Sequence, residues 1–478
     1  MNAELLNELT ALLPKDGILT NPAERLVYDC DAYTVEKSPP DIVVLPTTTA
    51  EVSAIVKACN RHDTPFLARG AGTGLSGGAI ALADTVVICL SRMNRILGVD
   101  AHNRTARVQA GVVNNAVSRQ VASLNLHFAP DPGSQTSSTI GGNIAENAGG
   151  PHTLKYGVTT HNTLAVQFVT SDGEIVEIGS DVEGLPGYDL VSLICGSEGT
   201  FGIVTEATVR LTPLPQSWRT LLAVFNTLDD ATNAVSAIIN EGVIPAALEM
   251  IDATVLESVE AAYNLGFPLD AAAVLLVEID GLDAGLDAAE AKCRAACQRH
   301  HARSVESARD EEERDALWTA RRKGVGTLGR IARSMVTQDC VIPRSRLPEV
   351  LREIGAIVSR YGLRVANIFH AGDGNLHPII LFDERVPDEV ERMTAANHEI
   401  VTLCLKMGGS LTGEHGIGLE KQDYMALMFG EDDLDMMIRV HKALDPDDLV
   451  NPGKFFPGSK KEFRETPESI TPRRTALV

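Results

Sequence analysis

The chain of 478 residues is too long for a single hydrophobic core, so two or three domains are expected. Its hydrophobic content of 44% and charged content of 22% are those of an ordinary globular protein. The formal net charge of −22 argues against a nucleic-acid partner and against electrostatic binding to an anionic membrane surface.

The N-terminus and the cysteines bear on the compartment. The opening Met1-Asn-Ala-Glu-Leu-Leu lacks the basic start and apolar core of a signal peptide, and no apolar run approaches the length of a membrane span. The 8 cysteines show no Cys-x2-Cys spacing, so we expect neither a disulfide framework nor an iron–sulfur cluster. We therefore expect a cytoplasmic protein without a transmembrane segment.

The first 70 residues predict alternating helices and strands. Residues 4–13 have the pattern of a helix, and residues 41–45 form a short β-branched strand that stops at Pro46. Thr49 is the expected N-cap of a helix that runs to about His62. Residues 65–69 are strand-like and lead directly into a glycine-rich loop.

This loop, residues 70–78, has the spacing G-x-G-x-x-G at Gly72, Gly74 and Gly77. A Rossmann site requires a helix that begins at the last glycine, whereas residues 85–90 predict a strand soon after the loop. We therefore reject a Rossmann site. Glycines still allow main-chain amides to approach a pyrophosphate closely, as a nest rather than a helix terminus.

Two further glycine clusters follow, in residues 130–150 and 195–204. A single cluster of this kind is typical of ordinary turns. Three clusters between β-rich segments indicate a backbone that is wrapped along an extended ligand.

The composition changes after Pro213-Leu-Pro215, where we place a domain boundary. Strands and helices then alternate, which favours an antiparallel sheet covered by helices. The expected strands are 221–225, 247–251 and 272–279, and the expected helices are 229–241, 286–301, 310–322, 387–406 and 423–441. The charge run 309–314 is interpreted as a solvated helix face.

Two polar motifs near the C-terminus are candidates for a metal site. His370 and His377 flank a Gly-Asp-Gly-Asn turn, and Glu414 and His415 lie in a second glycine-rich loop. Neutral imidazoles and a carboxylate are ligands that a divalent metal accepts, with positions left for a substrate. The alternative is that these histidines only cap the backbone of two turns.

Several unusual sequence motifs occur along the chain. The first half, with GAGTGLSGGA, IGGNIAENAGGPHTLKYGVT and GYDLVSLICGSEGTFGIVTEATVRL, resembles the FAD-binding domain of the vanillyl-alcohol oxidase superfamily, of p-cresol methylhydroxylase type. The phrases RRKGVGTLGRIA, FHAGDGNLHP, TGEHGIGLEK and NPGKFFP resemble the flavoprotein subunit of glycolate oxidase and FAD-linked D-lactate and D-2-hydroxyglutarate dehydrogenases. The resemblance covers about residues 20–457.

The resemblance implies an α+β fold: a two-part FAD-binding domain, an antiparallel-sheet (ferredoxin-like) cap domain and a C-terminal return segment. We expect the FAD-binding domain in residues 1–215, the cap domain with the metal site in 216–440 and the return segment in 441–457. Residues 458–478 are charged and dotted with proline, and we expect a disordered tail there.

The resemblance also implies the residues that contact FAD. Relatives with covalent flavin carry a histidine about where Thr73 falls, and threonine cannot form that bond, so non-covalent FAD is expected. The FAD-binding residues are expected to be Arg69, Gly70, Ala71, Gly72, Thr73, Gly74, Ser76, Gly77, Pro132, Gly133, Ser134, Thr139, Gly141, Gly142, Asn143, Ala145, Asn147, Gly149, Gly150, Tyr156, Gly157, Glu198, Gly199, Gly202, Ile203, Val204 and Asn451.

By the same resemblance, His370, His377 and Glu414 would bind a divalent metal, Zn²⁺ or Mn²⁺. His415 would be the general base, and Arg321 would bind the substrate carboxylate. For Arg321 the alternative is a surface salt bridge beside Arg322 and Lys323.

The expected activity is FAD-dependent oxidation of a small 2-hydroxy acid, glycolate or D-lactate, to the 2-oxo acid. Electrons would pass to a separate acceptor, such as an iron–sulfur subunit. Peripheral attachment to the membrane through that partner, and a homodimer, are alternatives that the sequence leaves open. D-2-hydroxyglutarate dehydrogenases have a lysine, a threonine and an asparagine where this chain has Thr337, Val325 and Ile379, which argues against that substrate. The alternatives are a D-2-hydroxyglutarate dehydrogenase, a zinc hydrolase with a flavoprotein-like fold, and a non-catalytic flavin subunit.

Overall fold

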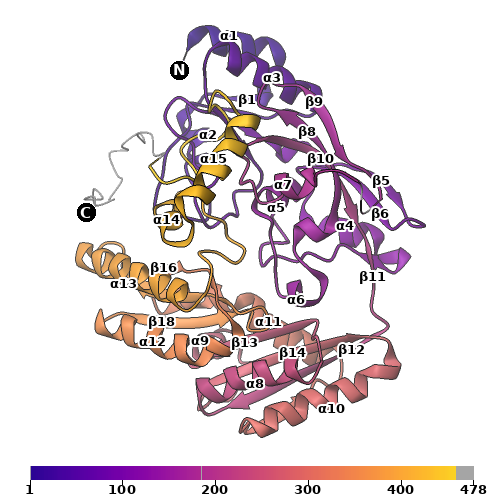
Figure 1. The fold of residues 1–478 in the computed structure, drawn as a ribbon, viewed down its shortest axis with the longest axis vertical. Helices are drawn as coiled ribbons and strands as arrows, with labels where there is room; N and C mark the ends of the chain where they lie inside the picture. Colours follow the sequence, from indigo (N-terminus) through magenta and orange to yellow (C-terminus); the bar gives the residue numbers. More distant parts are fainter. Residues whose placement is uncertain (1, 183, 185, 459–478) are drawn as a thin grey trace. The chain divides into compact units, whose positions relative to one another are not determined.

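The computed structural model describes residues 2–182, 184 and 186–458, and the tail expected from residue 459 on lies outside them. Contacts divide the chain into two compact units, each described by itself (Figure 1). Unit 1 contains the described residues up to Gly149, Gly157–Leu214 and those from Glu414 on, and unit 2 contains Gly150–Tyr156 and Pro215–Gly413. The chain therefore returns to unit 1 at Glu414, whereas the return segment was expected to begin at residue 441.

The first sheet of unit 1 has the strand order β1-β2-β4-β3. Strands β2, β4 and β3 run parallel, whereas β1 pairs with β2 in the antiparallel direction. Leu5 and Leu9 of the first helix and Val52, Ile55 and Val56 of a second helix are buried in its core. These elements are α1 (Ala3–Leu12), β1 (Ile18–Leu19), β2 (Ile42–Val44), α3 (Thr49–Arg61), β3 (Phe66–Arg69) and β4 (Val86–Cys89).

The N-cap of helix α3 is Thr48, so the prediction of Thr49 is wrong by one residue. The Thr48 hydroxyl accepts the backbone N–H of Glu51 at 3.2 Å, and the Glu51 carboxylate accepts the Thr48 N–H in return, which completes a capping box. Thr49 is the first helical residue, and its hydroxyl instead donates to Gln167 at 2.6 Å. Each of three consecutive threonines could serve as a cap, so the pattern did not select one.

The second sheet of unit 1 is antiparallel, with the strand order β5-β6-β10-β8-β9. Short helices pack against it around a core that includes Val117, Ile140, Ile144 and Val166. These elements are β5 (Ile96–Asp100), β6 (Thr105–Gln109), α4 (Asn114–Val121), α5 (Ile140–Glu146), β8 (Thr163–Thr170), β9 (Ile175–Gly179), α7 (Leu190–Ile194) and β10 (Gly202–Arg210).

The C-terminal segment of unit 1 returns to the first sheet. Val450 bridges Phe66 of strand β3, and the Asn451 N–H donates to the Phe66 carbonyl at 2.7 Å. The helix expected over residues 423–441 is two helices, α14 (Met425–Met428) and α15 (Glu431–Leu444), because Phe429 and Gly430 are extended. Gly430 serves as the N-cap of α15, ahead of three acidic residues that suit the first turn of a helix.

Unit 2 is built on one antiparallel sheet of seven strands, in the order β15-β12-β14-β13-β18-β20-β16. The α+β class and the antiparallel sheet of the second domain are thus confirmed. The strands are β12 (Ser217–Phe225), β13 (Ala247–Asp252), β14 (Ala273–Gly281), β15 (Ser304–Ser307), β16 (Ser334–Thr337), β18 (Arg364–Phe369) and β20 (Pro378–Phe382). A small pair, β17 (Cys340–Val341) and β19 (Asn375–Leu376), lies beside them.

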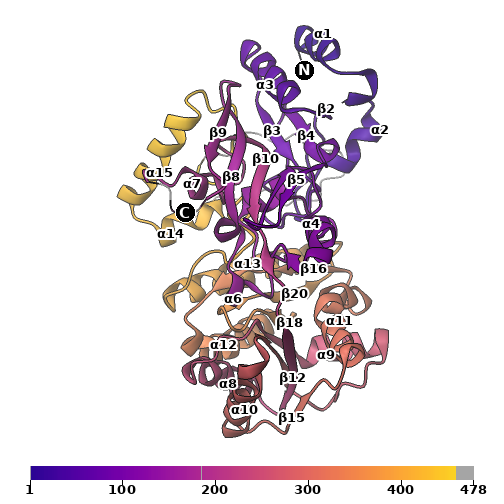
Figure 2. The same ribbon diagram turned by 90° about the vertical axis from the view of Figure 1, so that its right-hand side faces the viewer.

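Helices cover both faces of this sheet (Figure 2). One face carries α9 (Ala253–Tyr263) and α11 (Glu311–Thr327), and the core beneath them contains Val255, Ile368 and Ile379. The opposite face carries α8 (Leu228–Asn240), α10 (Asp283–Arg299), α12 (Leu347–Arg360) and α13 (Pro387–Lys406). Within the described residues, no helix combines the length and the hydropathy that crossing a membrane requires.

Helix α11 is attached to the sheet by charged as well as apolar side chains. Asp310 caps its N-terminus by accepting the Glu313 N–H at 3.0 Å, and Arg309 and Glu313 form an exposed ion pair. Arg314 instead turns inward and binds the buried carboxylate of Glu278 at 2.7 Å. The interpretation of residues 309–314 as a solvated face is therefore wrong for Arg314.

Candidate functional site

Four polar residues lie together on the face of the unit 2 sheet that helices α9 and α11 cover. Glu249 belongs to strand β13, His370 follows strand β18, His377 precedes strand β20, and Arg321 belongs to helix α11. The antiparallel pairing of β13 with β18 and of β18 with β20 sets neighbouring strands in this order. Side chains two residues apart point to the same face of a strand. Glu249 therefore shares its face with the core residue Ile251.

Glu249 lies between two of these residues. One carboxylate oxygen accepts from Nδ1 of His370 at 2.8 Å, and the other accepts from Nε of Arg321. Glu249 is fully buried, and the side chains of His370 and Arg321 are 7% and 11% exposed. Burial alone would raise the pKa of Glu249, but Arg321 and His370 outweigh it and hold that pKa below its usual value.

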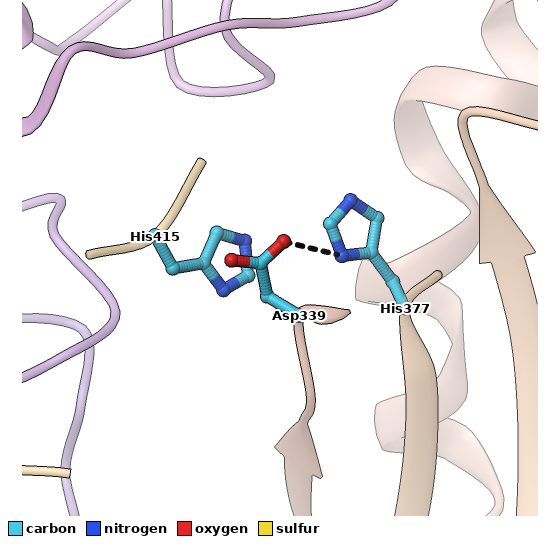
Figure 3. A group of neighbouring side chains, drawn as sticks. All are labelled: Asp339, His377 and His415. Carbon is cyan, nitrogen blue, oxygen red and sulfur yellow. Dashed lines mark ion pairs between the residues drawn. The ribbon is translucent and has the colours of Figure 1, made fainter. Parts of the chain in front are cut away.

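His377 lies beside His370, with ring centroids 5.3 Å apart and planes almost perpendicular. Nδ1 of His377 is 3.3 Å from the carbonyl oxygen of Gln338 and 3.8 Å from a carboxylate oxygen of Asp339. Figure 3 shows the Asp339–His377 ion pair as a dashed line. Ring nitrogens of the two histidines lie within 4.8 Å of each other, so both rings could bind one cation.

Asp339 also fixes the loop that follows helix α13. Its second carboxylate oxygen accepts from the Thr412 hydroxyl at 2.5 Å and from the Gly413 N–H at 2.8 Å. Glu414 and His415 follow Gly413 by one and two peptide bonds, and contacts group both with unit 1. Because Glu414 follows Gly413 directly, its Cα atom is about 3.8 Å from that of Gly413, whose N–H donates to Asp339.

The three residues expected to limit substrate size also lie in unit 2. Ile379 is buried in the core beneath α9 and α11, and Val325 of α11 packs against the same core. Thr337 is the direct partner of Ile379 in the pairing of β16 with β20. Ile379 is two residues from His377 and so lies on the same face of strand β20.

Most of the residues expected to bind FAD lie in unit 1, where the glycine clusters meet. A Cβ atom on Gly70 of the first cluster would be 2.3 Å from the Thr139 hydroxyl oxygen of the second. The Asn451 side chain donates to the carbonyl oxygens of Gly78 and Glu198, at 3.0 and 3.1 Å, and so joins the first and third clusters to the return segment. The fold thus brings the three clusters to one place.

Backbone conformation explains several of the glycines in these clusters. Gly72 has a φ of 70°, and a side chain there would collide with the guanidinium group of Arg69. Gly202 has a φ of 150° and lies against the ring of Phe168. At these two positions the absence of a side chain lets Arg69 and Phe168 lie directly against the main chain.

Other expected FAD residues have partners within the protein. Arg69 donates to the carbonyl oxygens of Cys30 and Ala79, Thr139 caps helix α5, and Asn147 accepts from the N–H and hydroxyl of Thr160. Ile203 is buried in the core of the first sheet and Val204 in that of the second. The remaining ones on the clusters themselves are Ala71, Thr73, Gly74, Ser76, Gly77, Pro132, Gly133, Ser134, Gly141, Gly142, Asn143, Ala145, Gly149 and Gly199, and Gly157 follows the second cluster.

Glu198, in the third cluster, holds the loop that continues from His415. Its two carboxylate oxygens accept the N–H groups of Ile417 and Gly418, both at 2.6 Å. Glu146 lies next to it, because a Cβ atom on Gly416 would be within 3.0 Å of both carboxylates. Burial, and then the neighbouring Glu198, raise the pKa of Glu146 well above its usual value.

Gly150 and Tyr156 differ from the rest, because they belong to unit 2. The Tyr156 hydroxyl donates to Asp280 at 2.5 Å, and Lys155 forms an ion pair with the same carboxylate. His152 stacks on Trp318 of helix α11 with ring centroids 5.3 Å apart.

Sequence reasoning did not single out Glu249 or Asp339 as site residues. Both are fully buried carboxylates, and a charged residue is almost never fully buried unless it is paired. For Glu249, the signal available in the sequence was a single glutamate within the apolar run 246–251, which indicates a buried and paired carboxylate.

The three glycine clusters meet in unit 1, and two histidines lie beside an arginine in unit 2, an arrangement typical of a flavin-dependent oxidoreductase. Residues 40–179 match the family described as FAD binding domain, and residues 214–455 match the family described as FAD linked oxidases, C-terminal domain. The protein therefore belongs to the FAD-linked oxidases.

Curated relatives share most of its length. The chain is 44% identical over 453 residues to the glycolate oxidase subunit GlcD of Escherichia coli, covering 95% of this chain and 91% of the relative. It is 32% identical to a D-lactate dehydrogenase of Anaerostipes hadrus, covering 95% and 97%. The fold is similar to that of p-cresol methylhydroxylase, with a TM-score of 0.81, 19% identity and coverage of 95% and 96%.

Proposed function

We propose that this FAD-dependent oxidoreductase oxidises glycolate or D-lactate to the corresponding 2-oxo acid. The observation that carries the proposal is the arrangement of Arg321, Glu249, His370 and His377 on one sheet face, in a chain whose relatives are named for those activities. FAD, when bound, accepts the hydride from C2 of the substrate. We infer that it is held non-covalently, because Thr73 cannot form the histidyl bond to flavin.

Arg321 is proposed to bind the substrate carboxylate. Glu249 occupies its Nε, and one terminal nitrogen lies 3.4 Å from Nδ1 of His370, so the remaining N–H groups of the guanidinium group are proposed to bind the substrate carboxylate. The planar fork suits this role better than the point charge of a lysine. The anionic substrate also needs such a local cation, because the chain carries a net charge of −22.

His370, His377 and Glu414 are proposed to hold a divalent metal, Zn²⁺ or Mn²⁺. The donor set fits: Nδ1 of His370 faces Glu249 and Nδ1 of His377 faces the Gln338 carbonyl, which leaves Nε2 of each ring as the ligand atom. Such a cation would polarise the substrate oxygens as a Lewis acid.

His415 is proposed to take the proton of the substrate hydroxyl. Its imidazole is suited to this role because an ordinary histidine changes charge near neutral pH. Electrons are proposed to leave through a separate acceptor chain, which the name of the relative as a subunit of glycolate oxidase supports.

The experiment measures metal and FAD content together with turnover to an artificial dye. The wild-type protein is expected to reduce the dye with glycolate and D-lactate, and His377→Ala is expected to lose metal and most turnover while keeping FAD. His398→Ala, which removes an exposed imidazole from helix α13, is the control and should change none of the three. Loss of FAD together with metal in His377→Ala would show that His377 supports the fold, and unchanged metal content would exclude it as a ligand.

A further inference from the structure

We propose that Glu249 is the positioning residue of the site, which holds the ring of His370 and the guanidinium group of Arg321 in one fixed arrangement. This inference rests on the proposed function for the roles of its two partners. It rests on the structure for the geometry, in which one buried carboxylate bonds to both side chains.

The carboxylate determines which nitrogen of His370 carries a hydrogen. A carboxylate can only accept, so the 2.8 Å contact with Glu249 requires a hydrogen on Nδ1 of His370. In the neutral ring, Nε2 then carries the lone pair and is the atom that can bind a cation. The carboxylate also makes the ring a stronger ligand, as in other carboxylate–histidine–metal arrangements.

The same carboxylate fixes the rotation of Arg321. Its second oxygen accepts from Nε, which restrains the guanidinium plane on the side facing the sheet. A terminal nitrogen of Arg321 is 3.4 Å from Nδ1 of His370, and both are hydrogen donors once Nδ1 is protonated. The negative charge of Glu249, which bonds to both side chains, offsets this close approach of two donors.

Distances along the chain show why one residue is needed for both tasks. Glu249 is 72 residues from Arg321 and 121 residues from His370, and the three belong to a strand, a helix and a strand end. Without a shared partner, each side chain would be free to adopt its own rotamers, and a displacement of about 1 Å at such a site costs about 100-fold in rate.

Helix α11 provides a matched control for this role. Two turns before Arg321, Arg314 pairs with Glu278, which is also a buried carboxylate on the same sheet face. Glu278 contacts none of His370, His377 and Arg321 in the described residues. Glu278→Gln therefore removes a comparable buried ion pair of α11 without touching the site.

The test compares Glu249→Gln with Glu278→Gln in the full-length, FAD-loaded protein. A glutamine at 249 can accept from one partner, but its amide group then meets the other donor. We expect Glu249→Gln to weaken Zn²⁺ binding, measured by competition with a chelator, by about 10–100-fold. We also expect Glu249→Gln to raise the KM for the hydroxy acid, and Glu278→Gln to lower the melting temperature without raising the KM.

The readouts separate this inference from the proposed function. Zn²⁺ affinity is measured without substrate, so weaker binding in Glu249→Gln alone would support the positioning role even if no hydroxy acid were oxidised. Wild-type Zn²⁺ affinity and KM in Glu249→Gln would overturn the inference. Equal losses in Glu278→Gln would also overturn it, because they would show that both carboxylates only attach helix α11.

Discussion

Replacing Glu278 with glutamine should destabilise unit 2, because this carboxylate is the buried centre of a charged network. Its oxygens accept from Thr220 at 2.8 Å, from Trp318 at 2.7 Å and from two nitrogens of Arg314 at 2.8 and 2.7 Å. Burial alone would raise the pKa of Glu278, but His152 and Arg314 outweigh it and hold that pKa far below its usual value.

The expected loss of stability follows from the geometry. Removing one partner of a buried ion pair costs about 3–5 kcal/mol, and the Glu278 side chain is only 3% exposed. Arg314 is 26% exposed and can recover part of its hydration, so we expect the lower end, about 3 kcal/mol. For a unit of about 200 residues this corresponds to a fall in melting temperature of roughly 6–12 °C.

The pH dependence has a defined sign. A carboxyl group whose pKa is lower in the folded than in the unfolded protein stabilises the fold above the unfolded pKa of about 4.3, and that stability is lost as the pH falls toward the folded value. The difference in stability between wild type and Glu278→Gln should therefore be full at pH 7 and shrink below about pH 4.

Tryptophan fluorescence is the suitable assay. The 2 tryptophans of the chain, Trp218 and Trp318, both belong to unit 2, so thermal unfolding of the FAD-free protein reports on that unit. Glu313→Gln, which breaks the exposed ion pair with Arg309, is the control and should have little effect. A shift in Glu278→Gln no larger than that of the control would refute the account of this network.

Two predictions concern the reaction. His415→Asn should keep metal and FAD while turnover falls roughly 10²–10⁴-fold, which steady-state kinetics at saturating substrate would check, and near-normal turnover would exclude His415 as the base. D-2-hydroxyglutarate should be a much poorer substrate than glycolate or D-lactate, because a second carboxylate against Val325, Ile379 and Thr337 would lack a charged partner. Initial rates for the three acids at matched concentration would check this, and the highest kcat/KM for D-2-hydroxyglutarate would show that the pocket assignment is wrong.

The sequence predicted the fold class because its signals are local. Gly72 and Gly202 adopt backbone conformations that require glycine, and strands β13 and β14 of unit 2 are mostly apolar and almost entirely buried. The wrong N-cap at Thr49 has a local cause, because three consecutive threonines offered equivalent caps, whereas the helix break at Gly430 was missed.

The sequence predicted only some of the residues of the candidate site. His370 and His377 were recognisable because they flank one turn, and the fold places Arg321 beside His370. Glu249 was not recognisable, because its partners Arg321 and His370 are 72 and 121 residues away. Strand pairing brings His370 close to Glu249, and the packing of helix α11 on the sheet brings Arg321. A long-range pairing of this kind leaves no periodic pattern in a single sequence.

The central claim, oxidation of a small 2-hydroxy acid by bound FAD, is tested most directly by mixing the FAD-loaded protein with D-lactate without oxygen or any other acceptor. The account predicts that the absorption of oxidised flavin disappears with glycolate and D-lactate, and far more slowly with L-lactate. Flavin that stays oxidised with both glycolate and D-lactate would contradict the account.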